Sequence, residues 1–228
     1  MLDWERNWRG AGVVFAVLIV IASLIYGSQP KVGASTDELV SFFDGDRNRI
    51  LIATVIFCFA FLELLWFGAA LASVLRDADK GVWAAAAIAS GATMGAILFV
   101  RMTVRAALAF SIAGSGSPFV TSGLADFAYV LTVLWFFPAA MFVMSGAFGL
   151  KQAGAISNRF FGVGVAAVVL ALLGGTTWAS DGFWAPDGAY SLIAALMVFL
   201  WIAVISGVLY MRSPAAVKTP DRAAVPTQ

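Results

Sequence analysis

The stretch that decides the fold is GAYSLIAALMVFLWIAVISGVLYM, residues Gly188–Met211, which contains no charged side chain. A helix needs about 20 mainly apolar residues to cross the hydrocarbon core of a membrane. Five further runs of this kind precede it, so the sequence predicts an all-α, polytopic membrane bundle of six transmembrane helices. These runs are Ala11–Gly27, Ile50–Leu75, Val82–Ile112, Gly123–Leu150 and Phe160–Ala179.

The composition of the 228-residue chain agrees with a membrane protein and excludes several other classes. Hydrophobic residues make up 61% and charged residues 12%, about half the charged share of a soluble domain. A net charge of +1 offers no basic surface for nucleic acid. The chain has no histidine, and Cys58 is its single cysteine. We therefore expect no metal site, no cofactor and no nucleic-acid partner.

The positive charges predict the orientation, because short cytoplasmic loops are enriched in Lys and Arg. With six spans and a cytoplasmic N-terminus, nine basic residues fall inside and three outside. The prediction is an inner (plasma) membrane protein with both termini in the cytoplasm, a single domain over residues 1–212 and a disordered cytoplasmic tail over 213–228. The inner basic residues are Arg6, Arg9, Arg76, Lys80, Lys151, Arg159, Arg212, Lys218 and Arg222; the outer ones are Lys31, Arg47 and Arg49.

The longest connection, between the first two spans, predicts a short helix. Ser35 followed by Glu38 is a capping-box pattern. Residues 36–43 then form an amphipathic segment that lies either on the outer membrane surface or as a lid over a cavity. After it, residues 44–48 read DGDRN, like the opening of a calcium loop. Arg49, however, occupies the position at which a calcium loop has its turn glycine. A polar turn is the favoured interpretation.

Small residues recur at four-residue spacing in two spans, which lets helix backbones approach closely. Packing within the bundle is the expected use, and a homo-oligomer contact is the alternative. Pro138, in the middle of the fourth span, predicts a kink. The two stripes are Ala87, Gly91 and Gly95 in the third span and Ala167, Ala171 and Gly175 in the fifth.

Four ionisable residues within the spans are the candidate functional cluster. Arg101 and Arg105 are one turn apart and share a helix face. From the helical rise, Glu63 matches the depth of Arg101, and Asp126 matches that of Arg105. Two pairs, Glu63 with Arg101 and Asp126 with Arg105, would neutralise one another and make burial tolerable.

Two polar residues, Tyr129 and Thr103, stand close enough in sequence to supply hydrogen bonds to this cluster. Glu63 is the deepest of the four charges, and its flanks are wholly apolar, so it is the candidate proton donor if the protein is an enzyme. The alternative is that the cluster only holds three helices in register.

The stretches Leu65–Leu71, Val74–Gly81, Asp37–Phe43 and Phe137–Ala140 resemble recurring patterns in bacterial, especially actinobacterial, six-helix integral membrane proteins of unknown function. The resemblance covers most of the chain. It implies a membrane location and a six-helix bundle, and it implies no activity.

Three functions are compatible with the sequence. The leading hypothesis is a non-enzymatic bundle that binds an apolar or amphipathic small molecule, or serves as accessory subunit to a membrane-protein partner, because no catalytic motif is present. The second is an enzyme acting on a lipid or isoprenoid with Glu63 as general acid. The third is a small transporter or proton pathway.

Overall fold

The computed structural model describes residues 4–212, and in this range the chain is helical with no strand. The all-α prediction is confirmed, while the predicted tail, residues 213–228, lies outside the described residues. The helices are α1 (Trp4–Tyr26), α2 (Thr36–Gly45), α3 (Arg47–Asp77), α4 (Gly81–Ala107), the π-helical turn η1 (Leu108–Ile112), the 3-10 turn η2 (Ala113–Ser115), α5 (Pro118–Leu134), α6 (Phe136–Gln152), α7 (Asn158–Gly174) and α8 (Ala189–Met211).

Five helical segments are long and apolar enough to cross a membrane: Asn7–Tyr26, Arg47–Asp77, Gly81–Ser115, Pro118–Gln152 and Ala189–Met211. The predicted fifth span is shorter than expected. It ends at Gly174 instead of Ala179, and its 17 residues extend roughly 25 Å at 1.5 Å per residue. The helix ends at two consecutive glycines, Gly174 and Gly175, which are weak helix formers. Phe136 and Phe137 pack directly against these two glycines. The protein is thus a membrane-type helix bundle.

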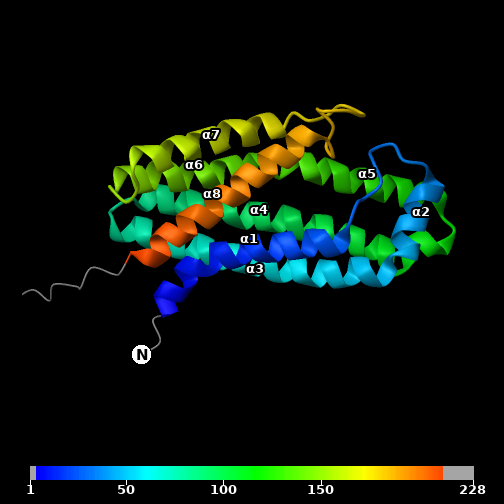
Figure 1. Ribbon diagram of the computed structural model, residues 1–228, viewed down its shortest axis with the longest axis horizontal. Helices are drawn as coiled ribbons and strands as arrows, with labels where there is room; N and C mark the ends of the chain where they lie inside the picture. Colours follow the sequence, from blue (N-terminus) through cyan, green and yellow to red (C-terminus); the bar gives the residue numbers. More distant parts are fainter. Residues whose placement is uncertain (1–3, 213–228) are drawn as a thin grey trace, which may run out of the picture.

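The contacts between the helices form a closed ring, and the helices run lengthwise along the long axis of the molecule (Figure 1). Helix α1 packs between α3 and α8, α3 packs on α4, α4 on α6, α6 on α7, and α7 on α8. Both ends of the described chain lie at one end of the bundle, which we call the proximal end, and α2 covers the other, distal end (Figure 1). The ring has a proximal half and a distal half that differ in packing.

The proximal half is densely filled, because glycines face large aromatic side chains. Trp201 of α8 is 1% exposed and lies against Gly146 of α6 and Gly164 of α7. A β-carbon added at Gly146 would lie 2.5 Å from the Trp201 ring. Close approach of this kind is how membrane helices gain packing contacts.

Both small-residue stripes face neighbouring helices of the same chain. In the first, a β-carbon added at Gly91 would lie 3.1 Å from the Phe142 ring. In the second, Ala167 and Ala171 are fully buried. The stripes therefore pack within the bundle, while a homo-oligomer stays a prediction.

Pro138 interrupts the fourth span as predicted. Helix α5 ends at Leu134 and α6 begins at Phe136, with a turn at Trp135 between them. A proline has no N–H to donate to the carbonyl four residues earlier, which here belongs to Leu134. On the proximal side of the break α6 packs on α4 and α7, whereas on the distal side α5 packs on α4 and α2. The distal half of the ring is consequently less closely packed on this side.

Helix α2 caps the distal end. The Ser35 hydroxyl accepts a hydrogen bond from the Glu38 amide at 3.3 Å, as the capping pattern predicts. The helix extends to Gly45, two residues beyond the predicted 36–43 segment. Its Leu39, Phe42 and Phe43 side chains are buried against the bundle, so α2 is a cover packed on the helix ends.

Candidate functional site

A cavity of about 550 Å³ lies in the distal half of the bundle, lined by α1, α3, α4 and α8 and partly open to the outside; we call it the main cavity. Its apolar walls come from all four helices, and its polar groups come from α1, α4 and the two distal connections. The apolar residues are Ile19, Phe57, Phe61, Leu98, Met102, Leu192 and Phe199, and the polar ones are Ser23, Tyr26, Ser28, Gln29, Lys31, Arg101, Arg105 and Asp187.

The two arginines of α4 both line the main cavity, as their spacing of one turn predicts. Arg105 is 5% exposed, and its guanidinium carbon lies 5.3 Å from the centre of the Tyr26 ring. This distance is within the range of a cation–π contact. Arg101 is half-buried, and its Nε is fully enclosed without a hydrogen-bond partner. Neither arginine is therefore simply reaching water along the helix.

Tyr26 is the second buried polar group of this cavity. Its side chain is 4% exposed, and its hydroxyl is enclosed with no hydrogen-bond partner. The ring is held on its other side by Phe42 of α2, with ring centres 5.7 Å apart. The capping helix therefore fixes the ring beneath Arg105.

The connection between α1 and α2, residues 27–35, crosses the distal mouth of the bundle and is fixed at two points; we call it the strap. Tyr129 of α5 donates its hydroxyl to the Pro30 carbonyl. On the other side the Asp187 carboxylate accepts a hydrogen bond from the Val32 amide at 3.2 Å. The strap begins at Gly27, whose φ of +75° ends α1 in a left-handed conformation that suits glycine.

A smaller space of about 240 Å³, the side cavity, adjoins the main one. The two share Arg101, Asp187 and Phe199 among their lining residues. The side cavity continues to Trp135 and Phe136, where α5 breaks from α6. Arg101 thus lies between two spaces, and the break at Pro138 contributes the wall of one of them.

The predicted ion pairs are wrong. Within residues 4–212 the single ion pair joins Arg49 and Asp46 at 2.5 Å, so neither Glu63 with Arg101 nor Asp126 with Arg105 forms one. Glu63 is half-buried and does not line the main or side cavity, and Asp126 is exposed.

The reason is rotation about the helix axis. Glu63 is two residues beyond Phe61, which turns it about 200° from that inward side chain. Of the two supporting residues, Tyr129 contributes through the strap and borders a small void beside Arg105. Thr103 is exposed and donates to the Phe99 carbonyl at 2.9 Å, a local helical bond.

The sequence prediction missed Tyr26 and Asp187. Tyr26 looks like an interfacial aromatic residue at the end of a span, and Asp187 looks like an ordinary loop residue. One signal was available for Asp187, since it directly precedes the Gly188 that starts the last apolar run. Nothing in the sequence marks Tyr26 as a cavity residue.

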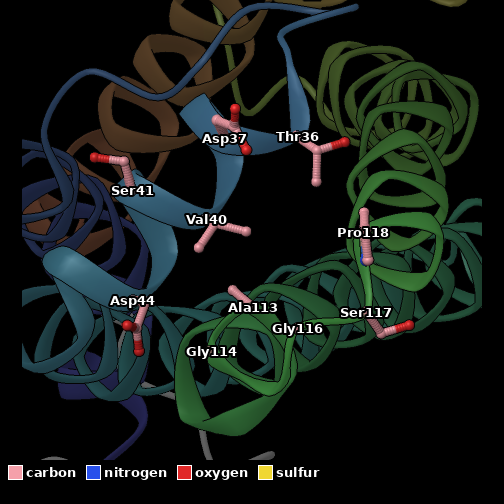
Figure 2. A pocket seen from close by; sticks show the side chains of 10 residues that line it. All are labelled: Thr36, Asp37, Val40, Ser41, Asp44, Ala113, Gly114, Gly116, Ser117 and Pro118. Carbon is pink, nitrogen blue, oxygen red and sulfur yellow. The ribbon is translucent and has the colours of Figure 1, made fainter.

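An open groove of about 500 Å³ lies on the distal surface between α2 and the turn before α5. Figure 2 shows Thr36, Val40 and Ala113 around its centre, with the Asp37 and Asp44 carboxylates at the α2 side. Both aspartates are exposed, and no cluster of metal-ligating residues occurs in the described part of the chain. The groove has no buried polar group to select a ligand, so the main cavity is the better candidate site.

No protein-family model, no curated protein and no solved structure matches this chain. The chemistry of the main cavity is therefore argued from its own residues.

Proposed function

We propose that the protein is a membrane-embedded binding protein that holds an amphipathic molecule in the main cavity. The observation that carries this proposal is that one cavity combines a buried arginine and a buried tyrosine with aromatic and aliphatic walls. Its volume of about 550 Å³ lies within the usual range of small-molecule sites, roughly 300–1,000 Å³.

The polar and apolar walls are ordered along the helices. On α1, Tyr26 is nearer the distal end than Ile19, and on α4, Arg105 is nearer to it than Leu98. A bound amphiphile therefore has its polar group under the strap and its apolar part toward the middle of the bundle. This is also the direction in which a lipid lies in one leaflet.

We further propose six membrane crossings with both ends of the described chain in the cytoplasm, in the plasma membrane, which places the cavity in the outer leaflet. The excess of basic residues at the proximal loops supports this orientation. Helix α7 is short, but it packs along α6 and α8 within the same ring.

Labelling of single cysteines tests the orientation. In a Cys58→Ser background, a membrane-impermeant thiol reagent added to intact cells should label Ser115→Cys and leave Asp77→Cys unlabelled. Both positions are exposed: Ser115 ends the 3-10 turn η2, and Asp77 ends helix α3, at opposite ends of the bundle. The reverse pattern would contradict the orientation.

The binding function is tested by filling the cavity. Ser23 lines the main cavity, whereas its neighbour Leu24 is 77% exposed and does not. Protein in nanodiscs of neutral lipid is titrated with dodecanoate and dodecanol, and empty nanodiscs give the background partitioning. Ser23→Trp should weaken binding about tenfold or more, while Leu24→Trp should not change it. Equal binding by both variants would mean that the cavity is not the site.

An enzyme with Glu63 as general acid is less well supported. A general acid must come within hydrogen-bond reach of the reacting group. Glu63 does not line either cavity, so an amphiphile bound there would not meet it. The accessory-subunit and transporter hypotheses stay predictions without a structural feature that favours them.

A further inference from the structure

The main cavity carries an excess of positive charge. Three basic side chains, Lys31, Arg101 and Arg105, line it against one carboxylate, that of Asp187. Two of the three are one helical turn apart, which corresponds to about 6 Å of rise, and so they repel each other. Asp187 forms no ion pair with either arginine within the described chain, and its Oδ2 accepts from the strap amide of Val32.

The buried donors in this region lack acceptors. An arginine side chain has five N–H donors and no acceptor, so only an oxygen-bearing group can satisfy it. In residues 4–212, neither Arg101 nor Arg105 donates a hydrogen bond, and Arg101 Nε is fully enclosed. The Tyr26 hydroxyl is also enclosed and unpartnered. Burying such groups without partners is costly, and the cost rises when they are charged.

We infer that the amphiphile bound in the main cavity has an anionic head, a carboxylate or a phosphate, held by the guanidinium groups of Arg101 and Arg105. This inference rests on the proposed binding function and specifies its ligand class. An anion supplies both the negative charge and the acceptor oxygens that the site lacks. Charge-assisted hydrogen bonds from arginine to such oxygens are among the stronger ones in proteins.

The depth of the arginines makes the ligand a chain-bearing anion. From the end of the π-helical turn at Ile112, Arg105 lies roughly 10 Å and Arg101 roughly 16 Å along the helix axis. Beyond Arg101 the cavity is lined by Leu98, Phe61 and Phe199. A free anion would leave this apolar section empty, whereas the tail of a lipid would fill it.

The test compares head groups on one chain length. Wild-type protein in neutral-lipid nanodiscs is titrated with dodecanoate, dodecyl phosphate, dodecanol and dodecyltrimethylammonium, and separately with inorganic phosphate. The two anionic amphiphiles should bind about tenfold or more tighter than dodecanol, and the cationic one should bind least. This comparison needs no variant.

The arginines are then tested one at a time. Arg101→Gln and Arg105→Gln should each lose about tenfold in affinity for dodecanoate and keep their affinity for dodecanol. Tyr26→Phe keeps the ring beneath Arg105 and should leave the affinity unchanged, because the hydroxyl that it removes is enclosed away from the cavity space. Arg47→Gln is the matched control, because Arg47 also lies 5.3 Å from an aromatic ring, that of Phe110, but does not line the cavity.

The outcomes separate the two proposals. If dodecanol binds as tightly as dodecanoate, the anionic head is wrong while the binding function stands. If none of the amphiphiles binds above background, the binding function itself fails. If inorganic phosphate binds as tightly as dodecyl phosphate, the ligand is a free anion and the inference of a lipid is overturned.

Discussion

The proximal and distal halves of the bundle share α1, α3, α4 and α8 but are packed differently. In the proximal half, glycines of α6 and α7 receive the Trp201 ring, and the interior is closed. In the distal half, two arginines and a tyrosine face a cavity of about 550 Å³. The difference indicates that the proximal half holds the helices together, while the distal half is shaped to receive a molecule. Each prediction below sets a change in one half against a matched change elsewhere.

The largest effect on stability is expected where a side chain replaces the hydrogen of a closely packed glycine in the proximal half. A β-carbon at Gly146 would lie 2.5 Å from Trp201, whereas nothing lies within 4 Å of one at Gly207. Gly146→Val should lower the free energy of unfolding by about 3 kcal/mol through overpacking. Steric trapping in neutral bicelles measures this value. Gly207→Val is the control, and its free energy of unfolding should change by less than about 0.5 kcal/mol. Equal values would show that the proximal half is not close-packed.

A second comparison truncates one leucine in each half. Leu71 is fully buried in the proximal core, and Leu98 borders both distal cavities. Leu71→Ala should cost about 2 kcal/mol of unfolding free energy, because packing contacts are lost on every side. Leu98→Ala should cost less than that, since Leu98, although only 4% exposed, borders two cavities and so has fewer packing contacts to lose. A larger cost at Leu98, measured in the same bicelles, would contradict the open distal half.

The strap gives a third and smaller effect. Asp187→Ala removes the acceptor of the Val32 amide, which should raise hydrogen exchange of that amide about fivefold, as expected for a bond of about 1 kcal/mol. Asp181→Ala changes an exposed aspartate in the same loop and serves as control. Hydrogen exchange followed by mass spectrometry over residues 27–35 makes the measurement. Unchanged exchange in Asp187→Ala would mean that the strap is held by other contacts.

The smallest effect is expected at the two carboxylates that the structure leaves outside the cavity. Glu63→Gln and Asp126→Asn should leave dodecanoate affinity unchanged and shift unfolding by less than about 0.5 kcal/mol. A loss of binding in Glu63→Gln would bring this residue back into the site.

The fold was more predictable from the sequence than the site. The length of the apolar runs predicted the long helices, and Pro138 predicted the break between α5 and α6. Both features depend on local chemistry. The end of α7 was placed five residues too late, although the helix ends at Gly174 and Gly175, two weak helix formers. The packing of Phe136 on Gly174 joins two different helices and cannot be read from the sequence.

The site was half predictable for a related reason. Arg101 and Arg105 were correctly placed together, because residues one turn apart share a face. Their carboxylate partners were wrong, because depth in the membrane is readable from sequence while the rotation of each helix is set by its neighbours. Tyr26 and Asp187 line the cavity because of how the helices pack and because Asp187 binds the strap. Neither arrangement can be read from the sequence, so the structure was needed to find these two residues.

The most direct test of the account is an experimental density map of the protein in neutral-lipid nanodiscs with dodecanoate. The account predicts elongated density in the main cavity. Its head should lie about 3 Å from guanidinium nitrogens of Arg101 and Arg105, and its tail should run along Phe61 and Leu98. A cavity that contains only water, or side chains that close it, would contradict the central claim that the distal half is a binding site.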